Sequence, residues 1–157
     1  MPPHRRAVYE QLLDPLRLAA LPRRYDNLTI VHGDAHVWNC MLPRDGGTDV
    51  RLIDWEVWRV NRAAADLAYM MAIHWYPDRR RQMERRLLDR YHATLFAHGV
   101  RDYDRATLDI DYRFAVLWHI ATPIWQAANN IPARVWWNNL ERIFLAVDDL
   151  KCRDLLD

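Results

Sequence analysis

Several residue types are scarce in this 157-residue chain, and each scarcity excludes a class of protein. Two cysteines, Cys40 and Cys152, are too few for a disulfide framework. Four glycines, at positions 33, 46, 47 and 99, leave no glycine-rich phosphate-binding loop of a known pattern. No apolar run approaches the roughly 20 residues that cross a bilayer, and the N-terminus does not resemble a signal peptide. We therefore expect a cytoplasmic protein that does not associate with membranes.

The charge of the chain is balanced, because 22 Lys and Arg residues stand against 21 Asp and Glu residues, for a net charge of +1. Lys151 is the one lysine. A chain so close to neutrality has no strong field to attract nucleic acid. One segment is locally basic, with Arg79, Arg80, Arg81, Arg85, Arg86 and Arg90. No aromatic platform is interleaved with these arginines, so we interpret them as a solvated helix face and expect no nucleic-acid partner.

The length and a hydrophobic content of 51% suit a single domain over residues 1–157. The β-branched stretch 28–31 predicts a short buried strand, and 40–43 and 50–53 predict two more on either side of a glycine pair. Helices are expected over 5–13, 15–20, 63–75, from 77 onward, over 104–128 with a kink at Pro123, and over 132–150. The pattern predicts a mostly helical α+β fold with a small β-hairpin and a helical bundle.

Apolar residues at helical spacing predict the buried faces of the later helices. In the helix from residue 77 they are Met83, Leu87, Tyr91 and Leu95. In 104–128 they are Phe114, Leu117, Trp118, Ala121 and Trp125, and in 132–150 they are Trp136, Leu140, Ile143, Phe144 and Val147. Most of the eight tryptophans are interpreted in the same way, as residues that fill the core.

The glycine pair predicts how the two strands of the hairpin align. A two-residue turn at Gly46-Gly47 is favoured because both positions of such a turn need a positive φ. In that register Asn39 lies directly opposite Asp54, with both side chains on one face about 5 Å apart. An amide oxygen and a carboxylate are the hard oxygen donors that hold Mg²⁺. The hairpin is therefore expected to carry a metal site at its open end.

A third polar residue, Asp34, precedes Asn39 by five positions and follows Gly33, which permits a sharp turn. A carboxylate there can orient or deprotonate an attacking hydroxyl. Asp-x-x-x-x-Asn, followed by an Asp at the end of the next strand, is the arrangement of the kinase catalytic loop and its metal-binding aspartate. Any one of these residues alone would be explained as a turn cap or a strand end. The three together at this spacing favour a phosphoryl-transfer site.

The segments His32-Gly33-Asp34-Ala35-His36-Val37-Trp38-Asn39 and Ile53-Asp54-Trp55-Glu56 resemble the H-G-D-x-H-x-x-N and I-D-W-E signatures of the aminoglycoside phosphotransferase and choline kinase superfamily. Ala65-Asp66-Leu67-Ala68 is similar to the D-L-A segment of that superfamily. The likeness extends more weakly through the later helices. It implies a protein-kinase-like fold and an ATP- and Mg²⁺-dependent transfer of the γ-phosphoryl group to an acceptor hydroxyl of a small molecule.

The resemblance also implies roles for individual residues. Asp34 would be the catalytic aspartate that faces the acceptor hydroxyl, and Asn39 and Asp54 would hold Mg²⁺ and with it the nucleotide phosphates. His32 would brace the loop through backbone hydrogen bonds. Asp66 would accept hydrogen bonds from loop amides. His36 and Glu56 would lie near the phosphates and the metal. Candidates for an acceptor pocket among the C-terminal helices are Trp58, Trp75, Tyr76, His119 and Trp125.

One departure from the superfamily is large. Its members have an N-terminal lobe with a nucleotide-covering loop and a lysine for the α- and β-phosphates. Here 27 residues precede the strand at 28–31, and the one lysine, Lys151, lies far beyond the motifs. The chain is expected to correspond to the C-terminal lobe alone, with little turnover by itself. We expect it to associate with itself or with a separate N-lobe chain.

Two other functions compete with this interpretation. The first is a non-catalytic binding or regulatory module that keeps the kinase-like lobe as a scaffold, and Mg²⁺-dependent binding of ADP or ATP would distinguish the two. The second is a metal-dependent hydrolase, since His32-x-Asp34-x-His36 alternates potential ligands of a transition metal. Gly33 interrupts the strand on which such ligands would align, so the hydrolase ranks last.

Overall fold

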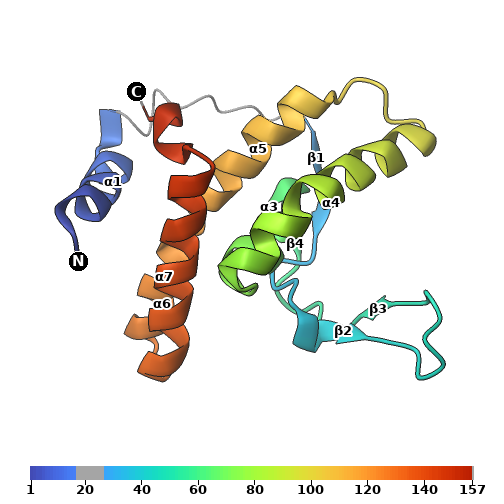
Figure 1. The fold of residues 1–157 in the computed structure, drawn as a ribbon, viewed down its shortest axis with the longest axis horizontal. Helices are drawn as coiled ribbons and strands as arrows, with labels where there is room; N and C mark the ends of the chain where they lie inside the picture. The colour runs from blue at the N-terminus through green and yellow to red at the C-terminus, as the bar shows by residue number, and fades with distance from the viewer. Residues whose placement is uncertain (17–26, 157) are drawn as a thin grey trace.

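The computed structural model describes residues 1–16 and 27–156 (Figure 1). Its helices are α1 (Pro3–Leu13), α3 (Ala64–Ala68), α4 (Pro77–Ala97), α5 (Arg105–Trp118), α6 (Ala121–Ala128) and α7 (Ala133–Asp149), with 3₁₀ turns η1 (Val37–Asn39) and η3 (Cys152–Leu155) and a π-helix η2 (Tyr69–Ile73). Its strands are β1 (Leu28–Val31), β2 (Cys40–Met41), β3 (Arg51–Leu52) and β4 (Arg59–Arg62). The mostly helical α+β fold is as predicted. Most of the expected helix at 15–20 lies outside the described residues.

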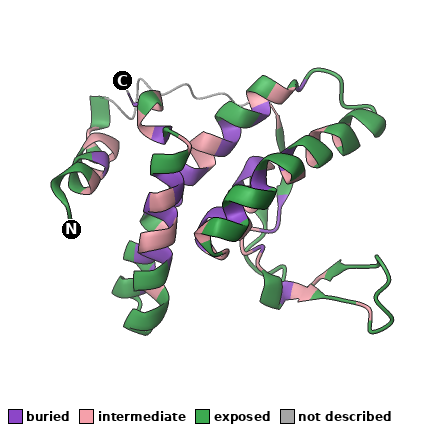
Figure 2. Ribbon diagram, in the orientation of Figure 1, coloured by how far each residue is buried: buried purple, intermediate pink, exposed green. Residues whose placement is uncertain are grey.

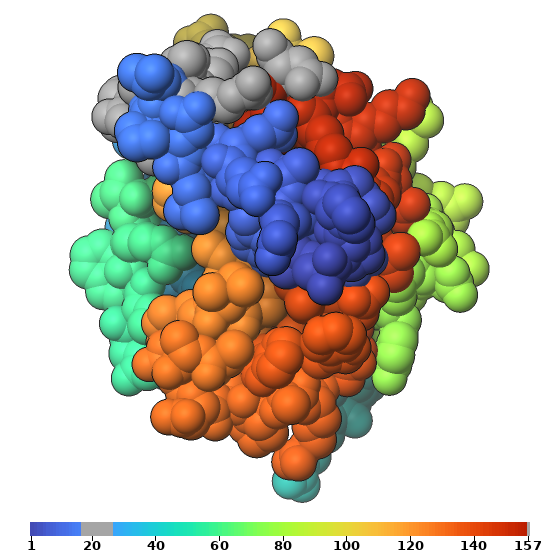
Figure 3. Space-filling model, turned by 90° about the vertical axis from the view of Figure 1, so that its left-hand side faces the viewer, coloured from blue at the N-terminus to red at the C-terminus, as the bar shows by residue number. Residues whose placement is uncertain are grey.

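The helices α3 to α7 enclose the hydrophobic core (Figure 2). α3 packs against α5, and α6 packs against α7. α1 lies on the outside of this group, as Figure 3 shows, and is joined to it by Arg5, which pairs with Glu141 at 2.8 Å, and by the Tyr9 hydroxyl, which donates to the Ile120 carbonyl. No helix among the described residues is long and apolar enough to cross a membrane.

The strands form two separate antiparallel ribbons beside the helices. β1 pairs with β4, and β2 pairs with β3 in a hairpin that projects from the helical body (Figure 1). The strand at 28–31 is confirmed, but β4 is not predicted by the sequence pattern, and β1 is not buried. Only Val31 of β1 is buried, because the ribbon has helices on one side only.

The predicted register of the hairpin is wrong by one residue. Cys40 pairs with Leu52, so Asn39 aligns with Ile53 rather than with Asp54, and the Ile53 amide donates to the Asn39 carbonyl at 3.0 Å. Gly46 has a positive φ of 76°, whereas Gly47 does not, so the two-residue turn is not formed. The chain turns instead where the Gly46 amide donates to the Pro43 carbonyl, within a longer loop. Because the turn lies within this longer loop, the position of the glycine pair does not determine which residues of β2 and β3 align.

The predicted kink at Pro123 is a complete break. α5 ends at Trp118 and α6 begins at Ala121, so that Pro123 lies in the first turn of α6, where its missing N–H costs nothing. The carbonyl of His119 accepts the Thr122 amide at 3.0 Å. α5 begins after Asp104, close to the predicted start, and is capped there, because an Asp104 carboxylate oxygen accepts the Thr107 amide at 2.6 Å.

The buried faces of the helices are partly as predicted. In α7 Leu140, Ile143, Phe144 and Val147 are buried, and Trp136 packs beside them. In α4 Met83 is exposed, and the buried residues are Arg80, Glu84 and Leu88. Six of the eight tryptophans are exposed, which corrects their assignment to the core; they are Trp38, Trp55, Trp58, Trp118, Trp125 and Trp137.

Candidate functional site

The site is built on the loop that connects β1 to β2. His32 directly follows β1 and is fully buried. Its Nε2 lies 2.8 Å from the Ile53 carbonyl oxygen, and its Nδ1 lies 3.2 Å from the Asp34 amide nitrogen. A carbonyl only accepts and an amide N–H only donates, so the proton of a neutral imidazole is on Nε2. His32 thereby ties the start of the loop to the end of β3, and neither nitrogen is free to bind a metal.

Asp66 on α3 holds the same loop from the helical side. Its two carboxylate oxygens accept the backbone N–H groups of His32 and Gly33 at 2.7 and 2.9 Å. Gly33 has a φ of +85°, and a Cβ at this position would lie 2.4 Å from the Val57 carbonyl oxygen. The tight passage of the chain between α3 and residue 57 therefore requires glycine.

The Asp34 carboxylate is oriented by three side chains. The Asn39 amide Nδ2 donates to the Asp34 carbonyl at 3.0 Å and to its Oδ2 at 3.1 Å, and His36 Nε2 lies 3.3 Å from the same Oδ2. Tyr69 is the third: burial, then a hydrogen bond to Asp34 and the charge of Asp34, raise the pKa of its hydroxyl well above the usual value. Because the amide nitrogen of Asn39 is directed at Asp34, its amide oxygen is left as an acceptor for another group.

Asp54 reaches the same place despite the shifted register. In a regular ladder a shift of one residue moves a side chain to the other face. Asp54, however, follows the end of β3 and has a left-handed backbone with a φ of 64°. A non-glycine residue in this conformation is strained, and such strain is common at functional sites. Asp34 and Asp54 consequently line one pocket, together with His36 and Glu56.

This pocket has a volume of about 760 Å³. One side consists of polar residues from the loop and from the segment between β3 and β4. The opposite side is more apolar and comes from the C-terminal helices and the turn before α7; it includes Trp118, Trp125, Ile131 and Val135. Trp118 and Trp125 are 60% and 62% exposed because they border this open space rather than the core.

The remaining expected residues fall into two groups. His32, Asn39 and Asp66 do not line the pocket and contact the loop from behind. Of the candidates for an acceptor pocket, His119 and Trp125 line it, whereas Trp58, Trp75 and Tyr76 do not. Tyr76 is exposed elsewhere, and Trp75 packs against the core.

Several residues that line the pocket are not singled out by the sequence reasoning, among them Arg59, Tyr69 and His74. Tyr69 and His74 flank the π-helix, and their ring centroids are 4.8 Å apart. In a π-helix residues five apart meet on one face, which an α-helix does not allow. A sequence pattern based on the α-helical period cannot show this pair. Arg59 has a weak signal, since it is a basic residue close behind the I-D-W-E segment.

Two of the histidines that line the pocket, His74 and His119, are uncharged near neutral pH. Burial, then the nearby His36, lowers the pKa of His74 to about 4. Burial also lowers the pKa of His119 to about 4, although its ring donates to the Ala65 carbonyl. The positive charge near Asp34 and Asp54 is therefore not supplied by these two imidazoles.

The donor set fits a hard cation better than a transition metal. No group of three or more His, Cys, Asp or Glu side chains among the described residues is arranged to hold a metal ion. Mg²⁺ needs only one or two carboxylates from the protein and completes its shell with water and phosphate oxygens. The carboxylate of Asp54 lines the pocket, and the amide oxygen of Asn39, which lies behind Asp34, is left as an acceptor; a carboxylate and an amide oxygen are the donor types that this smaller demand requires.

Comparison with known proteins places these residues in a family. No curated protein and no solved structure matches the chain. The sequence profile of the ecdysteroid kinase-like family matches residues 3–101, which is more than half of the chain and includes the loop, the hairpin and Asp66. This family lies within the protein-kinase-like, choline-kinase-type superfamily that the motifs resemble. The chain belongs to the ecdysteroid kinase-like family.

Proposed function

We propose that this protein is the acceptor- and metal-binding part of an ATP-using small-molecule kinase. The family supports a kinase-like phosphotransferase. The observation that carries the finer proposal is the single pocket lined by Asp34 and Asp54, with Asn39 hydrogen-bonded directly to Asp34. Phosphoryl transfer depends mainly on positioning and charge stabilisation. In this proposal Asp34 provides the positioning, and the Mg²⁺ held by Asn39 and Asp54 would provide the charge stabilisation.

In this proposal Asp34 faces the acceptor hydroxyl and accepts its proton as the oxygen attacks the γ-phosphorus of ATP, the bond from that phosphorus to the β,γ-bridging oxygen breaks, and ADP leaves. The hydrogen bond from Asn39 fixes the direction of the carboxylate, and His36 Nε2 lies 3.3 Å from the same oxygen. Asn39 and Asp54 would hold Mg²⁺, which would supply neutralisation of charge on the phosphates. Glu56 and His36 line the pocket beside them.

The acceptor is proposed to be an alcohol with an apolar body. The pocket wall of Trp118, Trp125, Ile131 and Val135 offers apolar contact beside the polar residues of the loop. The name of the matched family refers to ecdysteroid kinases, and an apolar ring compound bearing hydroxyl groups is consistent with such a wall. The nucleotide-covering loop and the phosphate-binding lysine of the superfamily would be supplied by an N-lobe.

The hydrolase is disfavoured because both ring nitrogens of His32 are used within the chain. The non-catalytic module is separated from the kinase by experiment. Calorimetry should show Mg²⁺-dependent binding of ADP to the wild-type protein. Asp54→Ala should abolish this binding because it removes a charged ligand, and Asn39→Ala should weaken it less because it removes a neutral one.

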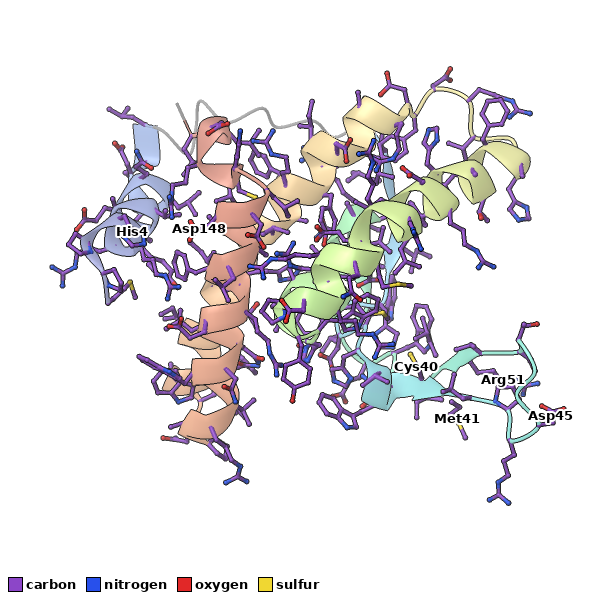
Figure 4. All side chains as sticks on the ribbon, in the orientation of Figure 1. His4, Cys40, Met41, Asp45, Arg51 and Asp148 are labelled. Atoms are coloured by element: carbon purple, nitrogen blue, oxygen red, sulfur yellow. The ribbon has the colours of Figure 1, made fainter. Side chains whose placement is uncertain are left out.

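Asp45→Ala is the matched control, since Asp45 lies at the tip of the hairpin, away from the helical body (Figure 4). Unchanged affinity in Asp54→Ala would contradict the metal assignment. Nucleotide binding without phosphoryl transfer to any of a panel of hydroxylated acceptors, even with an added N-lobe chain, would identify the non-catalytic module instead.

A further inference from the structure

Arg59, at the start of β4, extends over the loop at Gly33. A Cβ on Gly33 would lie 2.8 Å from Arg59 Nη1, so the absence of a side chain at position 33 leaves room for the guanidinium. Arg59 lines the same pocket as Asp34, Asp54 and Glu56. Its positive charge acts on two other residues of the pocket. Burial raises the pKa of Tyr69, and the charge of Arg59 opposes this larger effect. Burial lowers the pKa of His119, and the charge of Arg59 lowers it further.

The guanidinium of Arg59 makes few contacts within the protein. Among the described residues it forms no ion pair, and its one hydrogen bond is a long one, 3.5 Å from Nη1 to the Val57 carbonyl. Other arginines differ in this respect. Arg51 on β3 pairs with Asp49, Arg62 at the end of β4 pairs with Asp111, and Arg80 pairs with Glu84. Most of the donors of Arg59 are thus available to a ligand.

Arg59 is also the one arginine or lysine among the described residues that line the pocket. His74 and His119 are neutral near pH 7. Three carboxylates line the same space, yet none lies within ion-pair distance of Arg59. An arginine that lies beside carboxylates without pairing to them is suited to bind a multiply charged anion. The anion would contact the arginine on one side and a cation held by the carboxylates on the other.

We propose that Arg59 binds the oxygens of the phosphoryl group that is transferred, an inference that rests on the proposed kinase function. A guanidinium presents its N–H groups in a planar fork that fits two phosphate oxygens at once. In phosphoryl transfer such a fork offsets charge on the equatorial oxygens. Asp54 and Asn39 would act through Mg²⁺ on one side of the phosphate chain, and Arg59 would act directly on the other.

Binding of inorganic tripolyphosphate, measured by calorimetry with Mg²⁺ present, tests this role without any need for turnover. Arg59→Gln should weaken the affinity at least tenfold, because it removes the charge and most of the donors. The affinity of Arg59→Lys should lie between those of the wild type and Arg59→Gln, because lysine keeps the charge but lacks the planar fork of donors. Arg51→Gln is the matched control: Arg51 is on the projecting hairpin (Figure 4), does not line the pocket, and should bind as the wild type does.

A second measurement uses the unaltered protein, so it does not depend on the folding of a variant. Phenylglyoxal modifies accessible arginines, and peptide mapping locates the modified positions. Arg59 should react in the free protein and be protected by tripolyphosphate with Mg²⁺, whereas Arg51 should react equally in both states.

The outcomes separate this inference from the function on which it rests. Tripolyphosphate binding that is lost in Asp54→Ala but unchanged in Arg59→Gln, with no protection of Arg59, would overturn the role of Arg59 and leave the kinase proposal in place. A wild-type protein that binds neither tripolyphosphate nor ADP in the presence of Mg²⁺ would overturn both.

Discussion

Asp66 shows how one side chain determines the conformation of a loop more than thirty residues earlier in the chain. Its two oxygens accept the amides of His32 and Gly33, and His32 is fully buried. Buried amides left without acceptors carry a large desolvation cost. The carboxylate of Asp66 is therefore what allows the loop to turn inward and present Asp34 to the pocket.

Replacing Asp66 with alanine should lower the free energy of unfolding by about 1–3 kcal/mol for each amide left without a partner. Urea denaturation measures this loss, and hydrogen exchange at residues 32–39 should speed up as the loop becomes less ordered. Asp49→Ala is a suitable control, because Asp49 is exposed and pairs only with Arg51. Equal stability of Asp66→Ala and Asp49→Ala would show that Asp66 does not support the loop.

Among the elements, α4 is the one in which the burial of a charged side chain differs most from the sequence prediction. The sequence pattern assigns its arginines to a solvated face, and for Arg80 this is wrong, because its side chain is only 2% exposed. Arg80 donates to both oxygens of Glu84, at 3.1 and 2.9 Å, and also to Asp149 on α7. Glu84 in turn accepts the Tyr112 hydroxyl of α5 at 2.6 Å. A charged network thus joins α4 to α5 and α7.

Arg80→Met should reduce the free energy of unfolding by about 3–5 kcal/mol, because it leaves Glu84 as a buried charge without its partner. The double variant Arg80→Met/Glu84→Met should recover part of this loss, since both charges are then gone. Thermal or urea denaturation measures both. Arg85→Met, on the exposed side of the same helix, should change stability by no more than about 0.5 kcal/mol. A loss as small for Arg80→Met as for Arg85→Met would contradict the network.

Considered as a whole, the molecule places its pocket between two unequal parts. The helices provide a packed core and the apolar wall, and the two small ribbons provide the loop and the carboxylates. His119 belongs to the helical part: its ring is buried and contacts the Ala65 carbonyl of α3 and the Thr122 hydroxyl of α6. Association with an N-lobe chain or a second copy remains a prediction.

The low pKa of about 4 for His74 and His119 makes the stability of the fold dependent on pH. Between pH 6.5 and 4 the unfolded chain binds a proton on each imidazole and the folded chain does not. The stability from these groups is fully present above pH 6.5 and is lost as the pH falls toward 4. Each histidine should contribute a slope of up to about 1.4 kcal/mol per pH unit within that interval.

Urea denaturation from pH 7 to pH 4 measures the slope in wild-type protein, His119→Gln and His4→Gln. His119→Gln should have a smaller slope, because one of the two buried imidazoles is gone. His4→Gln should keep the wild-type slope, because His4 is exposed on α1 (Figure 4). If His119→Gln also kept it, protonation of His119 would not contribute to acid destabilisation.

The sequence by itself determined the features that depend on neighbouring residues. Local spacing and composition predict the strand at 28–31, the start of α4 at Pro77 and most of the buried face of α7. The residues singled out in the segments 32–39 and 54–56 follow in the same way, because the residue types and their intervals are visible in the printed chain. Their catalytic and metal-binding roles remain proposals.

Only the tertiary structure decided which distant residues meet. The hairpin register depends on a loop whose turn lies at Pro43–Gly46, and the left-handed backbone of Asp54 then returns its side chain to the pocket. The π-helix brings Tyr69 and His74 together, and Gly33 leaves the space that Arg59 occupies. Periodic patterns assign a residue to a face of its own element. They do not specify what packs against that face, and this is why Arg80 proved buried and six tryptophans proved exposed.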